Sequence, residues 1–270
     1  MRSFSHTDFG DLDLSAVSVV LPARECGATV GAIVQSIAAG QVLVVDAGSS
    51  DDTVAVAARA GAQVVQEAQL LPEFGPVLGK GDAMWRALSV VEHDVVVYVD
   101  ADTTQFDSHF VTGLAGPILT EPGIEFVKGA YTRPFVAGDA VVEGGGGRVT
   151  ELMARPLLRA FYPELAQLLQ PLAGEFAGRR ELFESLSWST GYAAEIAMVI
   201  DVWKAIGTNG MAQVDIGERR QPHQPLKSLS GMASTVLGAV CERLVAEGRM
   251  DADAAPPVDF AVRPPLVQCR

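Results

Sequence analysis

Cysteine is scarce in this chain, and the few cysteines present do not form a recognisable site. The 270 residues include three cysteines, Cys26, Cys241 and Cys269, which form no Cys-x-x-Cys pair and no metal-binding spacing. A disulfide scaffold or a cysteine-ligated zinc site is therefore not expected. Free thiols and a cytoplasmic location are the simplest expectation.

Positive charge is also in short supply. The chain has 20 Lys and Arg residues against 33 Asp and Glu residues, so its formal net charge is −13 at pH 7. This balance argues against a nucleic-acid groove or an anionic membrane surface as the main partner. An anionic small ligand would need a local group of positive side chains.

Long hydrophobic runs are missing as well. No apolar run reaches the roughly 18 residues of a membrane span, and the polar start MRSFSHTDFGDLDLS differs from a signal peptide. We expect neither a membrane segment nor a secretory leader. The chain is nevertheless 49% hydrophobic, and its length suits one α/β domain with a substantial core.

Strand-like and helix-like patterns alternate through the first half of the chain. Runs rich in β-branched residues predict buried strands, and segments with apolar residues at helical spacing separate them. Strands are expected at 16–23, 62–68, 94–100 and within 41–53, where a turn follows the strand, with helices at 28–40, 51–60 and 81–91. This alternation is typical of a parallel sheet with helices on both faces, which binds ligands at the carboxyl ends of its strands.

The second half of the chain is richer in helices. Further strands are expected at 123–134 and 211–217, whereas the glycine-rich stretch 137–147 cannot hold regular structure for long. Helices are expected at about 148–161, 178–186, 191–206 and 228–247. Residues 248–270 are expected to form a loose tail.

The segment DVVVYVDADTT, residues 94–104, places two carboxylates directly after a buried strand. Asp100 and Asp102 are two positions apart, so their side chains point to the same side of an extended chain and repel each other. A lone aspartate in this position commonly caps a turn or a helix. A pair instead favours a divalent cation, and oxygen ligands suit Mg²⁺ or Mn²⁺.

One interpretation of the pair is a phosphatase of the haloacid dehalogenase type, whose DxDx[TV] motif the segment resembles. Asp100 would be the nucleophile, Asp102 the acid and base, and Thr104 a structural hydroxyl. That family carries the motif on its first strand, whereas three strand–helix units precede it here. The only candidate for the family's second acidic pair lies within 138–143, and the first 90 residues would have no function.

A second interpretation is a glycosyltransferase of the GT-A fold, in which a DxD motif binds a divalent cation that bridges the diphosphate of a nucleotide sugar. The segment VVLPARE resembles the nucleotide loop of these enzymes, and VVDAGSSDDT resembles their hhDxGSxDxT turn. The GKG at 79–81 opens a helix, so Lys80 can meet a phosphate at the helix N-terminus. A sugar nucleotidyltransferase is disfavoured, because LPARECGATV lacks the glycine-rich loop that grips a triphosphate.

Further blocks narrow the resemblance. The stretches GGGGRVTEL, QPLAGEFAGRREL, GYAAEIAMVID and AQVDIGERRQPHQPL together resemble glucosyl-3-phosphoglycerate synthases and their mannosyl-transferring relatives, over about residues 16–247. The resemblance implies an α/β fold of the GT-A class, a Rossmann-like, mostly parallel sheet flanked by helices with a helix-rich C-terminal acceptor half. It also implies a retaining transfer of a hexosyl unit from a nucleotide sugar to the 2-hydroxyl of 3-phosphoglycerate.

The same resemblance implies how the chain is divided and what it binds. Residues 1–15 would be an N-terminal extension, 16–104 the nucleotide-sugar half, 105–247 the acceptor half and 248–270 a tail. The expected partners are a nucleotide sugar, UDP-glucose first, and 3-phosphoglycerate, in a homodimer without nucleic acid or membrane.

Site residues are implied by the resemblance, residue by residue. The nucleotide sugar would contact Pro22, Ala23, Glu25, Asp46, Lys80, Asp100 and Ala101. The acceptor would contact Gly147, Arg148, Val149, Thr150, Tyr192 and His223. Asp102 and Glu195 would be catalytic, and Asp102 with His223 would bind Mg²⁺ or Mn²⁺.

The residues at 144–150 favour an anion clamp on their own chemistry. Glycines let the backbone approach an anion closely, Arg148 offers a bidentate fork and Thr150 adds a hydroxyl. The alternative is a flexible linker. Tyr192 and Glu195 have an alternative too, because such a pair on a helix is often only a solvated edge.

The chain departs from the family pattern at the metal loop and at the nucleotide turn. Gln221 stands where relatives carry the histidine that completes the metal site, so either His223 or Gln221 would serve here. Ala47 stands where relatives often have serine, and this leaves UDP, GDP and ADP open as the nucleotide. A non-catalytic binder of the nucleotide sugar is therefore a third alternative.

Overall fold

An eight-stranded mixed sheet forms the centre of the protein. The computed structural model describes residues 1–137, 140–142, 146–219 and 226–269. The strand order is β1 (Arg2–Ser5), β11 (Met211–Glu218), β6 (Phe126–Thr132), β9 (Phe176–Arg179), β5 (Val95–Tyr98), β2 (Val17–Ala23), β3 (Gln41–Asp46) and β4 (Gln63–Gln66). Strand β9 is antiparallel to β5 and β6, and the other neighbours pair in parallel.

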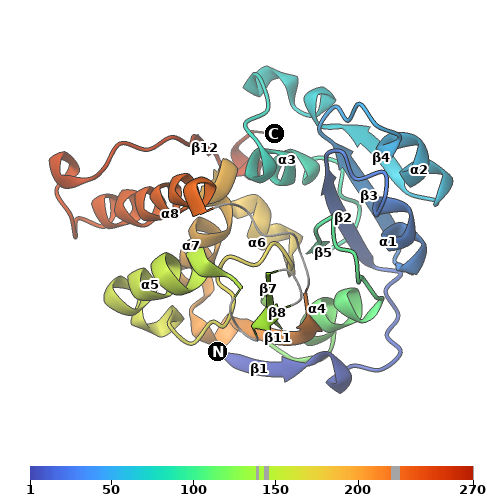
Figure 1. Cartoon of the computed structure of the whole chain (residues 1–270), viewed down its shortest axis with the longest axis horizontal. Coiled ribbons are helices and arrows are strands. Elements are labelled where there is room, and N and C mark those ends of the chain that lie inside the picture. The colour runs from blue at the N-terminus through green and yellow to red at the C-terminus, as the bar shows by residue number, and fades with distance from the viewer. Residues whose placement is uncertain (138–139, 143–145, 220–225, 270) are drawn as a thin grey trace.

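Helices cover both faces of this sheet (Figure 1). One face carries α1 (Val30–Ser36), α2 (Thr53–Arg59) and α4 (His109–Thr120). The other carries α3 (Lys80–Ala87), α5 (Arg155–Phe161), α6 (Arg180–Ser185), α7 (Ala194–Ile206) and α8 (Leu226–Ala246). The predicted α/β class, with a mostly parallel sheet between two helical layers, is confirmed.

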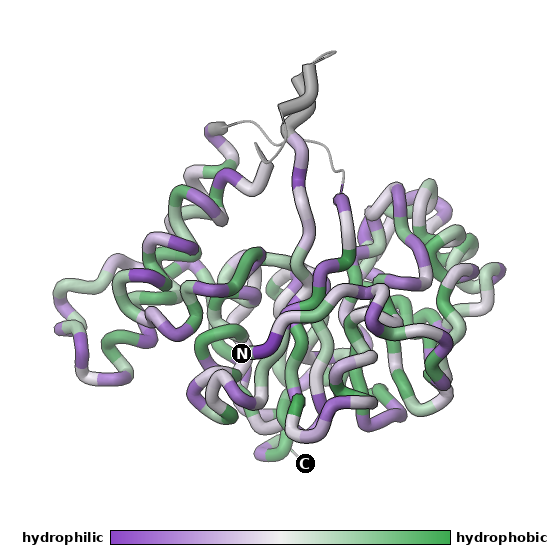
Figure 2. Tube along the Cα trace, turned by 90° about the horizontal axis from the view of Figure 1, so that it is seen from below, coloured by the Kyte–Doolittle hydropathy of each residue, from purple (hydrophilic) through white to green (hydrophobic). Residues whose placement is uncertain are grey.

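The central strands feed two separate cores, because successive side chains of a strand point to opposite faces. In β5, Val95 and Val97 pack with α1 and α4, whereas Val96 and Tyr98 pack with α3 and α7. Burial on both faces explains why this strand is continuously apolar in the sequence. Figure 2 shows hydrophobic stretches of chain in the middle of the molecule.

Short elements complete the described chain. Two small antiparallel pairs join β7 (Phe135–Ala137) to β8 (Ala140–Val142) and β10 (Trp188–Ser189) to β12 (Val262–Arg263). A π-turn, η4 (Thr150–Ala154), precedes α5. The 3₁₀ turns are η1 (His6–Asp8), η2 (Glu67–Gln69), η3 (Pro72–Phe74), η5 (Pro163–Leu165), η6 (Gly191–Ala193), η7 (Thr208–Gly210), η8 (Ala252–Ala254) and η9 (Leu266–Gln268).

Several elements differ from the sequence expectations. Residues 109–120 form a helix that the pattern did not indicate, and Pro117 lies inside it. Residues 176–179 are a strand, and the helix expected from 178 begins only at Arg180. The start of the chain is an edge strand of the main sheet, with Arg2 beside Ala212, rather than a separate extension.

The expectation of a loose tail is wrong for the described residues up to 269. Strand β12 pairs with β10, and Leu266 is buried in the larger core. The prediction failed because the tail is polar and proline-rich in sequence, and its partners lie far away along the chain.

Helix α8 is long and apolar enough to span a membrane by length and composition alone. The absence of a membrane-length run, expected from the sequence, is therefore wrong by this criterion. In the structure, Val236, Ala239, Val240 and Leu244 of this helix lie in the core, which accounts for its apolar character. The three cysteines are free thiols, as expected.

Candidate active site at the carboxyl edge of the sheet

The carboxyl ends of β2, β5, β6 and β11 lie at one edge of the sheet, where a cavity of about 800 Å³ opens. Strand β9 runs the other way, so its beginning lies at this edge. The cavity brings together nine of the predicted residues, namely Lys80, Asp100, Asp102, Gly147, Arg148, Val149, Thr150, Tyr192 and Glu195. It is also lined by residues that the sequence analysis did not predict, including Arg24, Tyr131, Arg133, Gln170, Gly174 and Arg219.

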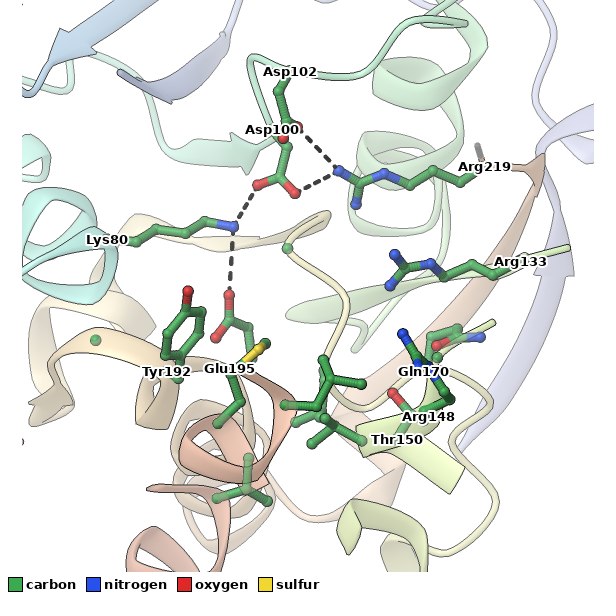
Figure 3. A pocket seen from close by; sticks show the side chains of 18 of the residues that line it. Lys80, Asp100, Asp102, Arg133, Arg148, Thr150, Gln170, Tyr192, Glu195 and Arg219 are labelled. Atoms are coloured by element: carbon green, nitrogen blue, oxygen red, sulfur yellow. Dashed lines mark hydrogen bonds and ion pairs between the residues drawn. The ribbon is translucent and has the colours of Figure 1, made fainter. Parts of the chain in front are cut away.

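Asp100 is held between two cations on the floor of the cavity. Lys80 forms an ion pair with one carboxylate oxygen, and Arg219 Nη2 lies 2.6 Å from the other (Figure 3). Burial alone would raise the pKa of Asp100, but Lys80 and Arg219 together hold it well below its usual range. Both oxygens of Asp100 are therefore engaged, which does not suit a nucleophile for a phosphatase.

Asp102 presents its carboxylate to the cavity instead. Its side chain is 64% exposed, and its Oδ1 lies 3.5 Å from Arg219 Nη2. The two aspartates of the motif thus have different environments, because Asp100 is 18% exposed and held by two cations whereas Asp102 is mostly exposed. This difference follows from the turn after β5, because only the first aspartate lies deep enough to meet Lys80.

Arg219 and Glu175 form a buried ion pair beneath the two aspartates. The Arg219 side chain is 2% exposed and that of Glu175 is 1% exposed. Burial raises the pKa of the Glu175 carboxyl, although the Arg219 charge opposes this shift. Arg219 directly follows β11 and Glu175 directly precedes β9, so a strand-end search would have found Arg219. Glu175 could not be found in that way, because β9 was not predicted.

Gly174 brings backbone close to the Lys80–Asp100 pair. A Cβ at this position would lie 2.4 Å from Lys80 Nζ and 2.6 Å from Asp100 Oδ1, so no larger side chain fits without moving that pair. The adjacent carbonyl of Ala173 accepts a 2.7 Å hydrogen bond from the fully buried Lys128. Burial lowers the pKa of Lys128 to about 8.

Lys80 and Glu195 connect two helix N-termini across the cavity. Lys80 is the first residue of α3, and its Nζ lies 3.4 Å from Glu195 Oε1 at the start of α7. Burial would lower the pKa of Lys80, but the Asp100 and Glu195 carboxylates raise it, so the ammonium stays charged. Glu195 is therefore part of a charged cluster and not a solvated edge.

Tyr192 stands at the mouth of the cavity, in the turn η6. Tyr192 is 54% exposed, which is unusual for a large aromatic residue in this structure. The preceding Gly191 has φ +61°, a left-handed conformation that lets the chain turn sharply between β10 and α7. Figure 3 shows Tyr192 beside Glu195 and Lys80.

The predicted clamp lies at the opposite end of the cavity. Gly147 has φ +69°, and its carbonyl accepts a 3.0 Å hydrogen bond from the Glu151 N–H. Figure 3 shows Arg148, Thr150 and Gln170 gathered there, with Arg133 between them and Arg219. A helical turn begins at Arg148 and passes into η4. The stretch 146–150 is thus ordered around the cavity and is not a linker.

The predicted nucleoside residues form a neighbouring loop system and do not line the cavity. Asp46 is 1% exposed, and its carboxylate accepts hydrogen bonds from Gly48 N, Ser49 N, Ser49 Oγ and Gln66 Nε2. The Glu25 carboxylate accepts from Ser50 N at 2.7 Å. These carboxylates therefore shape the turn by holding its backbone.

The remaining predicted residues of this loop system lie within or beside strand ends. Pro22 and Ala23 are the last residues of β2. The carbonyl of Ala101 accepts a 2.6 Å hydrogen bond from Thr29 Oγ1. Gln221 and His223 lie outside the described residues, so the choice between them stays a prediction.

Known proteins resemble this chain in sequence and in structure. A model described as Glycosyl transferase family 2 matches residues 18–137. A glucosyl-3-phosphoglycerate synthase from Petrotoga mobilis is 45% identical over 78% of this chain, and the aligned part spans 65% of that protein. Its counterpart from Mycolicibacterium smegmatis is 40% identical over 94% of this chain and 90% of its own length.

Solved structures of similarly named enzymes superpose on this chain. Mannosyl-3-phosphoglycerate synthase from Rubrobacter xylanophilus superposes with a TM-score of 0.90, at 42% identity, over 99% of this chain and 97% of that chain. Glucosyl-3-phosphoglycerate synthase from Mycobacterium tuberculosis, in complex with Mn²⁺, UDP-glucose and phosphoglyceric acid, superposes with a TM-score of 0.85. That likeness holds at 36% identity over 100% of this chain and 99% of the other.

Proposed function

The chain belongs to the glucosyl-3-phosphoglycerate synthase family of glycosyltransferases, and on this basis we propose that it transfers glucose from UDP-glucose to the 2-hydroxyl of 3-phosphoglycerate. The observation that carries the proposal is one cavity with two chemically different ends. At one end, the exposed carboxylate of Asp102 lies near the cations Lys80 and Arg219. At the other end, the cavity is lined by Arg148, Thr150 and Arg133. A nucleotide sugar suits the first end and a small phosphorylated acid suits the second.

The bound molecules of a relative support the choice of substrates. The M. tuberculosis enzyme is described in complexes with UDP-glucose and phosphoglyceric acid, and with UDP and glucosyl-3-phosphoglycerate. Mannose stays an alternative sugar, because the R. xylanophilus structure is a mannosyl-3-phosphoglycerate synthase.

A divalent cation fits the residues at the first end. Among the described residues, no group of three or more His, Cys, Asp and Glu side chains is placed to hold a metal ion. Asp102 offers one hard oxygen ligand, and Mg²⁺ is commonly held by one or two carboxylates together with phosphate oxygens. We therefore propose Asp102 as the carboxylate ligand, with His223 as the candidate second ligand. When bound, the cation neutralises negative charge on the leaving diphosphate.

Two positively charged side chains of the protein would also stabilise the leaving diphosphate. Lys80 and Arg219 both face the place where the diphosphate would lie, and both stay charged at neutral pH. Their charge becomes more valuable as the sugar–oxygen bond breaks and negative charge grows on the diphosphate. Asp100 keeps both cations in position and prevents them from repelling each other.

Glu195 and Tyr192 border the sugar in this proposal. Glu195 is held by Lys80 at the start of α7, so its second oxygen can accept a hydrogen bond from a sugar hydroxyl. Tyr192 covers the cavity mouth and offers an aromatic face to the sugar or the acceptor. Glu195 would thus orient the sugar for attack by the acceptor hydroxyl.

The acceptor would bind through its two anionic groups. A guanidinium binds a phosphate or carboxylate through a bidentate fork, and the acceptor end of the cavity is lined by Arg148 and Arg133. Thr150 adds a hydroxyl donor. The clustering of these groups explains how a protein of net charge −13 can hold a trianion.

One reaction series tests the proposal. Purified protein with Mg²⁺ or Mn²⁺ and 3-phosphoglycerate would receive UDP-glucose, GDP-mannose or ADP-glucose in separate tubes, and the release of nucleoside diphosphate would be measured. We expect acceptor-dependent release with UDP-glucose. Nucleotide binding in calorimetry without release from any donor would instead identify a non-catalytic binder.

Assembly and location are further proposals. We propose a homodimer, which light scattering on the purified protein would test. A cytoplasmic location agrees with the free thiols, and fractionation of the source cell would test it.

A further inference from the structure

The C-terminal segment returns across the molecule and meets elements that carry site residues. After α8 the chain turns at Gly248, which has φ +68°. Figure 1 shows the red terminal segment running back along α8 towards α3. Residues 259–264, here called the C-terminal brace, make contacts with α8, β10 and α3 in turn.

The brace first ties α8 to the turn before Tyr192. Asp259 accepts hydrogen bonds from Thr235 Oγ1 at 2.9 and 3.1 Å. Ala261 then bonds to Thr190 in both directions, with Thr190 N donating to Ala261 O at 2.9 Å and Ala261 N donating to Thr190 Oγ1 at 3.0 Å. Thr190 is the residue before Gly191 and Tyr192, so the brace holds the entrance to η6 directly.

Arg263 ties the same segment to α3. Its Nε and Nη2 donate to the two carboxylate oxygens of Asp82 at 2.8 and 2.7 Å, which is a bidentate fork. Its Nη1 donates to Phe74 O at 2.8 Å. Asp82 is fully buried and lies two residues after Lys80 in the first turn of α3. Trp85, on the same helix, donates from Nε1 to Pro264 O at 3.0 Å.

The elements held by the brace are themselves packed without space between them. A Cβ on Gly81 of α3 would lie 2.3 Å from Ser189 O of β10 and 2.8 Å from the Ala194 side chain. A Cβ on Gly79 would lie 3.6 Å from Gly191 Cα. The start of α3 therefore rests directly on the β10–η6 segment, and β12 holds that segment from the other side.

We propose that the C-terminal brace, through Arg263, positions Lys80 and Glu195 relative to each other and so acts in binding the sugar donor. This inference rests on the proposed function, in which Lys80 and Glu195 meet the donor. Arg263 itself does not line the cavity and is a positioning residue. Among the residues that the structure describes, Arg263 hydrogen-bonds to Asp82, Phe74 O and Pro76 O and not to the acceptor end at 147–150, so we assign the effect to the donor alone.

Arg263→Gln tests the inference, with Arg249→Gln as a matched control. Arg249 also belongs to the C-terminal region and pairs with Glu247 at 2.9 Å and with Phe161 O at 2.7 Å, and none of these three residues lines the cavity. We expect Arg263→Gln to lower kcat/KM for the nucleotide sugar by about tenfold or more, because small misplacements of catalytic groups cost up to about a hundredfold. The KM for 3-phosphoglycerate should change less than about twofold, and Arg249→Gln should match the unmodified protein.

Hydrogen exchange provides a readout that does not need activity. In Arg263→Gln the Thr190 amide should exchange about tenfold faster, as expected when local opening becomes easier by about 1.4 kcal/mol. Unchanged exchange at Thr190 would overturn the inference even if the protein proved to be no transferase. Normal exchange and normal donor kinetics, in an active enzyme, would overturn the inference and leave the proposed function intact.

Two further variants separate positioning from simple loss of folding. Thr190→Val removes the hydroxyl that accepts from Ala261 N while keeping the side-chain volume, and it should raise donor KM in the same direction as Arg263→Gln. Arg263→Lys keeps the charge but cannot form the fork, so it should rescue donor kinetics only in part. Equal losses for donor and acceptor in both Arg263→Gln and Thr190→Val would show a merely structural role and contradict the inference.

Discussion

The substitution Arg219→Gln, which removes the positive partner of Glu175, is the sharpest test of the buried ion pair beside the cavity. In Arg219→Gln the Glu175 carboxylate, which is 1% exposed, would lose its ion pair while remaining buried. Breaking a buried pair by removing one member typically costs about 3–5 kcal/mol, because an uncompensated charge remains. Arg219→Gln should therefore lower the free energy of unfolding by about this amount at pH 7.

A comparison with a double variant isolates the part of this cost that comes from Glu175. Arg219→Gln and the Glu175→Gln/Arg219→Gln double variant both lose the contacts of Arg219 with Asp100 and Asp102, so only the fate of the carboxylate differs. We expect the double variant to recover about 1–3 kcal/mol relative to Arg219→Gln. Arg2→Gln is the exposed control, since Arg2 and Glu121 are 42% and 35% exposed and such pairs contribute at most about 1 kcal/mol.

The difference in unfolding free energy between these two variants should depend on pH with a definite sign. Burial raises the pKa of Glu175 in the folded protein, and loss of Arg219 raises it further, so the folded state takes up this proton at higher pH than the unfolded state. Lowering the pH from 7 towards the unfolded pKa of about 4.3 should therefore shrink the difference between Arg219→Gln and the double variant.

Urea unfolding followed by circular dichroism measures all of these free energies. A cost below about 1 kcal/mol for Arg219→Gln would refute the reasoning, because the pair would then behave as an exposed one. A difference between the two variants that grew at lower pH would refute the assignment of the cost to a buried carboxylate.

Three further predictions concern the cavity. Asp102→Ala should abolish metal-dependent transfer while circular dichroism stays unchanged, because the side chain is 64% exposed; unchanged turnover would remove its role at the metal. Arg148→Ala should raise the KM for 3-phosphoglycerate far more than the donor KM, since loss of a charge-assisted pair costs about 2–5 kcal/mol, and an effect below about threefold would contradict the clamp. Burial lowers the pKa of Lys128 in the folded protein to about 8, so above that pH the unfolded chain binds more protons than the folded one. The free energy of unfolding, measured relative to Lys128→Met, should therefore rise between pH of about 8 and about 10.5. If urea unfolding shows no change in this difference over that range, the prediction is wrong.

The sequence determined the layered architecture and the location of the site. The continuous apolar runs of β2, β3 and β5 predicted strands buried on both faces, and the intervening helical spacing predicted a parallel sheet. A parallel sheet places its ligand at the carboxyl edge, and Asp100, Asp102 and Lys80 were found there on that argument. The clamp predicted at 147–150 was implied by the family resemblance and favoured by its glycines and its Arg-x-Thr, and these residues line the cavity.

Local pattern could not reveal contacts made across the sheet. Glu175 enters the site because β9 is antiparallel, and a four-residue strand inserted between helical stretches carries almost no periodicity of its own. The helix at 109–120 was missed for a similar reason, since glycines and a proline weaken its pattern. Buried charges such as Lys128 read as ordinary surface residues in a sequence.

The amino-acid sequence alone determined the α/β class, the order of most elements and the carboxylates that follow the strand ending near residue 100, because these depend on local periodicity and turn chemistry. Tertiary structure alone decided which of two neighbouring aspartates is held between two cations and which is mostly exposed, which arginine lies beside them, and where the C-terminal segment docks. Those outcomes depend on distances between residues remote along the chain, such as Asp82 and Arg263, and on burial, which sets the strength of every charge in the site.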